Sequence, residues 1–182
     1  MNIMRVEAKQ ARVDTETTDA LALLICEGEG LPKEDGVILD RALGGTLREL
    51  LQSKEFDGKA GEVVVFHTHR KIPAKRLILV GLGKKHELGL DQIRQAMGHA
   101  VKRVRHAKCG AFTVALPSVV PHGASLLDVG QAMTEGAILG SYQFTTYRSD
   151  VPTGKEVRAM TILASQKGQL RELSEGIRRG VA

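Results

Sequence analysis

The chain has 182 residues, about the length of one domain. Its 26 Lys and Arg against 21 Asp and Glu give a formal charge of +5 at pH 7, and 42% of the residues are hydrophobic. These values exclude a disordered chain, a collagen-like chain and a disulfide scaffold. The two cysteines, Cys26 and Cys109, lie far apart in or beside apolar runs, so we expect buried thiols without a zinc or redox role.

Short apolar runs alternate with longer amphipathic segments along the chain. The short runs predict buried strands at Ile3–Val6, Ala20–Cys26, Glu62–His67, Arg76–Val80, Phe112–Leu116 and Val157–Ala164. The longer segments predict one helix through Ile38–Leu51, a second through Ile93–Ala107, a third from Ser125 to Ala137 and a last at Gln169–Val181. Buried strands separated by helices are typical of a three-layer α/β/α domain with a parallel or mixed sheet.

Two local patterns refine the helix predictions. Ser125 and Asp128 are three residues apart at the start of the third helix, which predicts a capping box. The last helix runs to the end of the chain with Gly180 as its only candidate cap, so we expect the chain to be the front part of a longer protein.

Targeting signals are lacking at the N-terminus. The first residues have no basic region followed by a long apolar stretch. The longest apolar run, Ala20–Cys26, is too short to cross a bilayer. We therefore expect a cytoplasmic protein with no membrane partner.

One predicted strand runs into Gly81-Leu82-Gly83, followed by two lysines. Glycines at such a position let backbone amides approach a phosphate, so Gly81 and Gly83 form a candidate phosphate-approach turn. However, His86 stands where a dinucleotide fingerprint needs its third glycine, and the P-loop pattern also fails. A tight turn after a buried strand is the simpler interpretation.

No catalytic or metal-binding constellation is visible in the sequence. His67 and His69 share one strand face and His99 and His106 one helix face, but neither pair has an adjacent carboxylate ligand. Nothing marks a nucleophilic Ser or Cys either. We predict no catalytic residues, no metal ligands and no cofactor in this chain.

The predicted helix through Ile93–Ala107 carries a cluster of basic residues. The candidate nucleic-acid contacts are Arg94, Lys102, Arg103, Arg105 and Lys108. The modest net charge and only six aromatic residues argue against a platform that stacks single-stranded bases. A solvated helix face is the plain alternative.

Four segments in order resemble the N-terminal domain of the cytosolic leucyl aminopeptidases, the M17 metallopeptidases. They are Ala42–Leu47, Phe56–Glu62, Arg76–Lys85 and Glu135–Ser149. The resemblance covers essentially the whole chain and implies a macro-domain-like α/β/α fold for residues 1–182.

The resemblance also implies a role. In the family this domain precedes a catalytic domain that binds two divalent metal ions, manganese or zinc, and releases N-terminal residues such as leucine from peptides. Family members assemble as hexamers, and some bacterial members also bind DNA. The resemblance thus implies a non-catalytic domain for assembly or regulation, with the catalytic domain expected after residue 182. The alternatives are a nucleic-acid-binding module and a macro-type module for a nucleotide or ADP-ribose.

Overall fold

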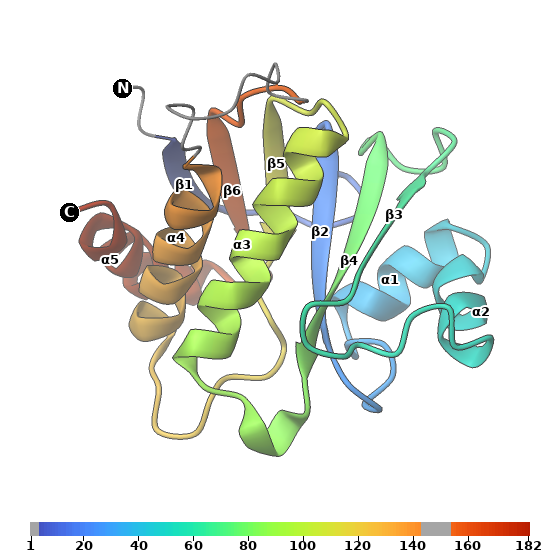
Figure 1. The fold of residues 1–182 in the computed structure, drawn as a ribbon, viewed down its shortest axis with the longest axis horizontal. Coiled ribbons are helices and arrows are strands. Elements are labelled where there is room, and N and C mark those ends of the chain that lie inside the picture. The colour runs from blue at the N-terminus through green and yellow to red at the C-terminus, as the bar shows by residue number, and fades with distance from the viewer. Residues whose placement is uncertain (1–3, 143–153) are drawn as a thin grey trace, which may run out of the picture.

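The computed structural model describes residues 4–142 and 154–182, and Figure 1 shows their arrangement. Within these ranges the chain forms one six-stranded sheet in the order β1-β6-β5-β2-β4-β3. All neighbouring strands pair in parallel except β3, which runs antiparallel to β4 at one edge. The strands are β1 (Arg5–Gln10), β2 (Ala20–Cys26), β3 (Val63–His67), β4 (Arg76–Gly83), β5 (Ala111–Ala115) and β6 (Ala159–Ala164).

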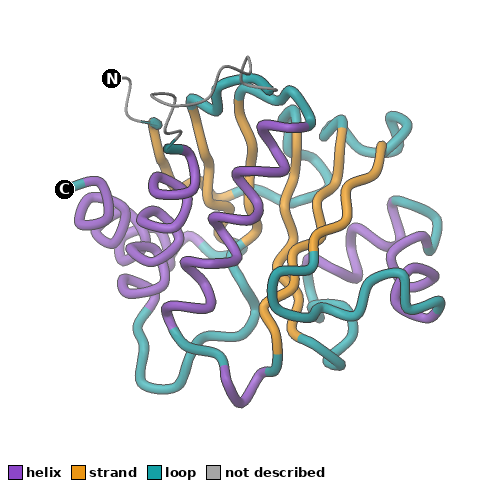
Figure 2. Tube along the Cα trace, viewed as in Figure 1, coloured by secondary structure: helices purple, strands orange, loops and turns teal. Residues whose placement is uncertain are grey.

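Helices cover both faces of this sheet, as Figure 2 shows by secondary structure. The helices of the described ranges are α1 (Asp35–Ala42), α2 (Thr46–Gln52), α3 (Leu90–His106), α4 (Leu126–Ser141) and α5 (Leu170–Val181). Two short 3₁₀ turns, η1 (Lys85–Glu87) and η2 (Lys167–Gln169), precede α3 and α5. Helices α3, α4 and α5 pack on one face, and α1 and α2 pack on the other over β2 and β4. The mixed sheet and the α/β/α layering confirm the predicted fold class.

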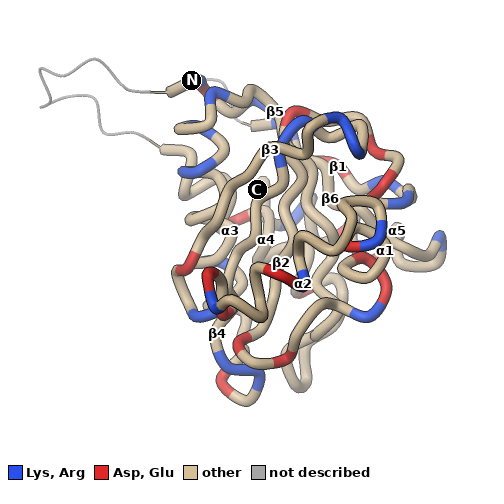
Figure 3. The backbone as a smooth tube through the Cα atoms, turned by 90° about the vertical axis from the view of Figure 1, so that its right-hand side faces the viewer, with Lys and Arg blue, Asp and Glu red and all other residues tan. Residues whose placement is uncertain are grey.

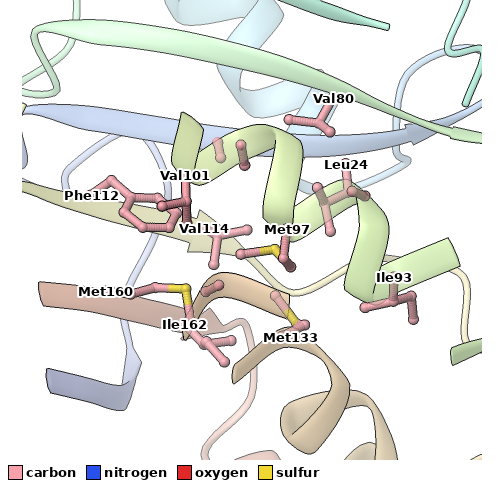
Figure 4. Packing of buried hydrophobic residues seen from close by; sticks show 14 of the residues in the cluster. Leu24, Val80, Ile93, Met97, Val101, Phe112, Val114, Met133, Met160 and Ile162 are labelled. Atoms are coloured by element: carbon pink, nitrogen blue, oxygen red, sulfur yellow. The ribbon is translucent and has the colours of Figure 1, made fainter. Parts of the chain in front are cut away.

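The central strand β2 is buried along its whole length because both of its faces lie in hydrophobic cores. Ala22 and Leu24 face the cluster formed with α3, α4 and α5, whereas Leu23 and Ile25 face the cluster formed with α1 and α2. Figure 4 shows part of the first cluster, to which Met97 of α3 and Met133 of α4 both belong. A continuous apolar run such as Ala20–Cys26 is what a strand with two covered faces requires.

The single helix predicted through Ile38–Leu51 is wrong. The structure has two helices, α1 and α2, separated by Gly44 and Gly45, whose φ angles of 72° and 87° lie in the left-handed region. Glycine adopts that conformation at little cost, so the pair ends α1 and turns the chain into α2. Asp40 supports the turn, because its carboxylate accepts a hydrogen bond from the backbone N–H of Arg48 at 3.0 Å.

Other predicted boundaries also shift. Strand β1 begins at Arg5 and continues to Gln10, whereas the sequence favoured Ile3–Val6. Gly180 lies inside α5 rather than after it, and a Cβ there would come within 2.8 Å of the Thr134 Cβ on α4. This glycine therefore serves the contact between two helices and not a C-cap. Residues 143–149 of the fourth family-like segment lie outside the described ranges.

Candidate functional site

The carboxyl ends of the parallel strands meet at the lower edge of the sheet in Figure 1. Strands β2 and β5 are neighbours, and after them the chain crosses to opposite sides of the sheet. From β2 it continues through α1 and α2 toward the β4 side, and from β5 through α4 to β6. Open α/β sheets bind ligands in the crevice that such a change of direction creates. The sheet order alone therefore marks this edge as the candidate site.

A cleft of about 540 Å³ lies at this edge. That volume is within the roughly 300–1,000 Å³ range of small-molecule sites. Its lining comes from four segments far apart in sequence. They are the end of β2 with residues 29–35, the end of β4 with Lys85, residues 116–120 with Leu126 of α4, and Ser165, Gln166 and Gln169 after β6.

The wall formed by the loop after β2 carries most of the charge in the cleft. Glu29, Lys33, Glu34 and Asp35 line this side, and Lys85 faces Glu29 at 3.5 Å from the end of β4. Asp35 is half-buried in the first turn of α1. Burial, and to a lesser degree the charge of Glu34, raises the pKa of the Asp35 carboxyl.

Cys26 lines the same cleft from the end of β2. Burial, and then the charge of Glu29, raises the pKa of this thiol, so it is held in its protonated form. Cys109 is also buried, and burial likewise raises its pKa. Both cysteines are free thiols inside the core, as the sequence predicts.

Gly81 and Gly83 do not form a turn, because β4 continues through them. Their backbone N–H groups already donate hydrogen bonds, Gly81 to the Glu62 carbonyl at 2.8 Å and Gly83 to the Gly58 carbonyl at 3.0 Å. A Cβ at Gly81 would overlap the carbonyl oxygen of Lys59. The glycines therefore admit a neighbouring loop against the strand, and neither amide is left for a phosphate.

The five candidate nucleic-acid contacts do not share one open face. Arg94 lies against α4, with its Nε 2.6 Å from Glu135 and its Nη1 2.7 Å from Asp91. Arg105 is half-buried and donates to the Ser141 carbonyl at 3.5 Å. Lys102, Arg103 and Lys108 are exposed. Figure 3 shows acidic and basic residues interspersed along the backbone.

The residues present do not fit the metal centre that the resemblance implies for the longer enzyme. Across residues 4–142 and 154–182, no three His, Cys, Asp or Glu side chains lie close enough together to hold a metal ion. His67 and His69 are neighbours, with ring centroids 6.2 Å apart, but no third ligand joins them.

In the part of the chain that the structure describes, no helix is long and apolar enough to span a membrane.

The mixed six-stranded sheet between two layers of helices is an α/β fold that solved macrodomains share. A Trypanosoma brucei macrodomain in complex with ADP superimposes with a TM-score of 0.70 at 12% identity, over 95% of this chain and 69% of that one. A tomato leucine aminopeptidase mutant superimposes with a TM-score of 0.73 at 23% identity, over 93% of this chain and 34% of that one. At these identities the likeness shows the fold alone.

The sequence comparison then identifies the family. Residues 21–151 match the profile of the cytosol aminopeptidase family, N-terminal domain. A probable cytosol aminopeptidase from Geobacter sp. (strain M21) is 37% identical over 98% of this chain and 36% of its own length. The chain belongs to the cytosol aminopeptidase family and corresponds to its N-terminal domain. It spans about a third of the length of the curated relatives it matches.

The family was visible to sequence reasoning, but the cleft was not. The loop at residues 29–35, which forms its charged wall, carries no motif. The signal that was available is positional, since Glu29, Glu34 and Asp35 directly follow a fully apolar strand. In α/β folds, side chains in that position come to the ligand-binding edge.

Proposed function

We propose that this chain is the non-catalytic N-terminal domain of a cytoplasmic, metal-dependent aminopeptidase that releases N-terminal residues from peptides, and that the domain serves assembly or regulation. One observation carries the proposal. The chain belongs to the cytosol aminopeptidase family and spans about a third of the length of its relatives.

In this proposal the chemistry belongs to residues beyond this chain. Two divalent ions, manganese or zinc, would supply the activated water and polarise the peptide carbonyl in the catalytic domain. The full-length protein would assemble as a hexamer. Within this chain, the cores on both faces of the sheet provide a rigid body that can hold a fixed position in such an assembly.

The experiment compares three proteins: the 182-residue chain, the full-length protein, and the full-length protein without residues 1–182. We expect leucine p-nitroanilide hydrolysis with Mn²⁺ or Zn²⁺ from the full-length protein and none from the chain. The truncated protein should keep the metal ligands. It should differ from the full-length protein in turnover rate, or in the number of subunits per particle that light scattering gives. Activity in the chain alone, or none in the full-length protein, would overturn the proposal.

Neither alternative function gains a comparable observation. A nucleotide site is suggested by the macrodomain that was solved with ADP, because the cleft here lies at the ligand-binding edge of the same kind of sheet. The acidic wall at Glu34 and Asp35 opposes the binding of phosphate groups. The nucleic-acid alternative is weaker because Arg94 and Arg105 contact α4 and do not share the open side of α3 with the other basic residues.

A further inference from the structure

The cleft contains a carboxylate that the protein does not neutralise. Asp35 lines the cleft and is half-buried, and no hydrogen-bond or ion-pair partner contacts its carboxylate among the described residues. The neighbouring Glu34 adds a second negative charge, and its side chain makes no capping bond to α1. A partly desolvated carboxylate without a partner interacts most strongly with a ligand that brings a positive charge and N–H donors.

The lining contributed by the segments after β5 and β6 has a different character. It is formed by Leu116, Val119, Val120 and Leu126, with the uncharged polar groups of Ser118 and Gln166 beside them. None of these six lining residues carries a formal charge. The cleft therefore offers the carboxylates of Asp35 and Glu34 to a cation and apolar side chains to an aliphatic group.

The helix ends at this edge do not favour an anion. The N-terminus of α1 already has Asp35 in its first turn, and Asp128 occupies the N-terminus of α4 through its capping box with Ser125. An anion bound at either helix end would therefore lie beside a carboxylate of the same charge. Glu29, which pairs with Lys85 at 3.5 Å, reduces the attraction of that lysine for a phosphate.

We propose that the cleft is a regulatory site for the N-terminal end of a short aliphatic peptide. The peptide ammonium group lies against Asp35 and Glu34, and the aliphatic side chain lies on the wall of Leu116, Val119 and Leu126. The choice of a peptide among aliphatic amines rests on the proposed function, since peptides are the substrates of an aminopeptidase. The volume of about 540 Å³ leaves room for more than one residue.

The experiment is isothermal titration of the 182-residue chain with three probes. Leu-Leu-amide carries the ammonium group and no carboxylate, N-acetyl-Leu-Leu-amide lacks the ammonium group, and ADP supplies phosphates. We expect binding of the first probe only. Substitution of Asp35→Asn should weaken it by about tenfold, the size of one charge-assisted hydrogen bond. Glu7→Gln, which removes an exposed carboxylate from β1, should leave the affinity unchanged.

Several outcomes would overturn the proposal. They are equal affinity for the acetylated peptide, binding of ADP without binding of the peptide, or no heat with any probe. The acetylated probe tests the charge requirement on the unaltered chain, so the result does not depend on how the variant folds. Peptide binding by the chain together with an inactive full-length protein would refute the proposed function alone. An active full-length protein whose N-terminal domain binds no peptide would refute this inference alone.

Discussion

A Cβ atom at Gly136 of α4 would overlap the carbonyl oxygen of Arg94 and come within 2.7 Å of its Cα. At Gly140, one turn further along, a Cβ would come within 2.6 Å of the Cα of Gly98. Helices α3 and α4 therefore touch backbone to backbone, and only a residue without a side chain permits this distance. The ion pair between Arg94 and Glu135, at 2.6 Å, lies beside the same contact.

We expect Gly136→Ala to destabilise the chain by about 1–3 kcal/mol, because the added methyl group must push the two helix backbones apart. Urea denaturation followed by circular dichroism measures this change. Gly98→Ala is the matched control in the same interface, since a Cβ there meets only the Gly136 carbonyl oxygen at an ordinary 3.7 Å. The control should be neutral or gain about 0.5–1 kcal/mol from helix propensity. Equal losses in both variants would contradict the described packing.

At the scale of single elements, local sequence determines where a helix begins if nearby side chains form hydrogen bonds with its terminal backbone groups. Asp128 Oδ2 accepts hydrogen bonds from the N–H and the Oγ of Ser125, both at 2.8 Å, and Ser125 Oγ accepts one from the N–H of Asp128 at 3.2 Å. The start of α4 is thus the capping box that the sequence predicts. The break between α1 and α2 shows the opposite case, because an apolar period that spans Gly44 and Gly45 does not reveal their left-handed backbone.

The capping box should make the stability of the chain depend on pH. The hydrogen bonds from the Ser125 backbone and side chain lower the pKa of Asp128 in the folded state. As the pH falls, the unfolded chain binds this proton first. The cap therefore adds to the free energy of unfolding at pH values above the ordinary Asp pKa. This contribution is lost as the pH falls through the lowered pKa of the folded state.

Asp128→Asn tests this dependence through urea midpoints. The unaltered chain should exceed the variant in stability at neutral pH, and the difference should narrow toward about pH 3, where the carboxyl group is protonated in the unfolded chain. Glu7→Gln, which removes an exposed carboxylate of β1 that caps no helix, serves as the comparison and should leave the urea midpoint at neutral pH nearly unchanged. A difference for Asp128→Asn that does not change with pH would show that the charge of the cap is not involved.

Over the whole molecule, the two hydrophobic clusters share the same central strands. Leu24 and Val80 belong to the cluster on the α3 side, and their chain neighbours Leu23 and Leu79 belong to the cluster on the α1 side. Neither layer of helices can leave without exposing strands on which the other layer depends. The two cores should therefore unfold together.

We expect the 182-residue chain to unfold in a single transition. Far-ultraviolet circular dichroism, which follows the helices, and hydrogen exchange of β2 should report the same free energy of unfolding. Loss of α1 and α2 at lower urea than α3 and α4 would contradict the coupling. Leu24→Ala and Leu23→Ala, one on each face of β2, should each cost about 2–5 kcal/mol in that same single transition.

Much of this protein follows from its sequence by itself. Apolar runs located all six strands of the described sheet to within a few residues, and amphipathic periods located α3, α4 and α5. These features depend on neighbours one to four positions away, so a linear pattern contains them. The family-like segments identified the N-terminal domain of an aminopeptidase for the same reason, because each motif is a short run of consecutive residues.

Only the tertiary structure decided what depends on distant partners. It placed Gly180 against Thr134 and Gly136 against Arg94, and it turned Arg94 away from the other basic residues of α3 toward Glu135. It also assembled the cleft, whose walls come from residues 29–35, 116–120 and 165–169. Parallel pairing of β2, β5 and β6 brings these loops to one edge, and no local pattern encodes which strands will be neighbours.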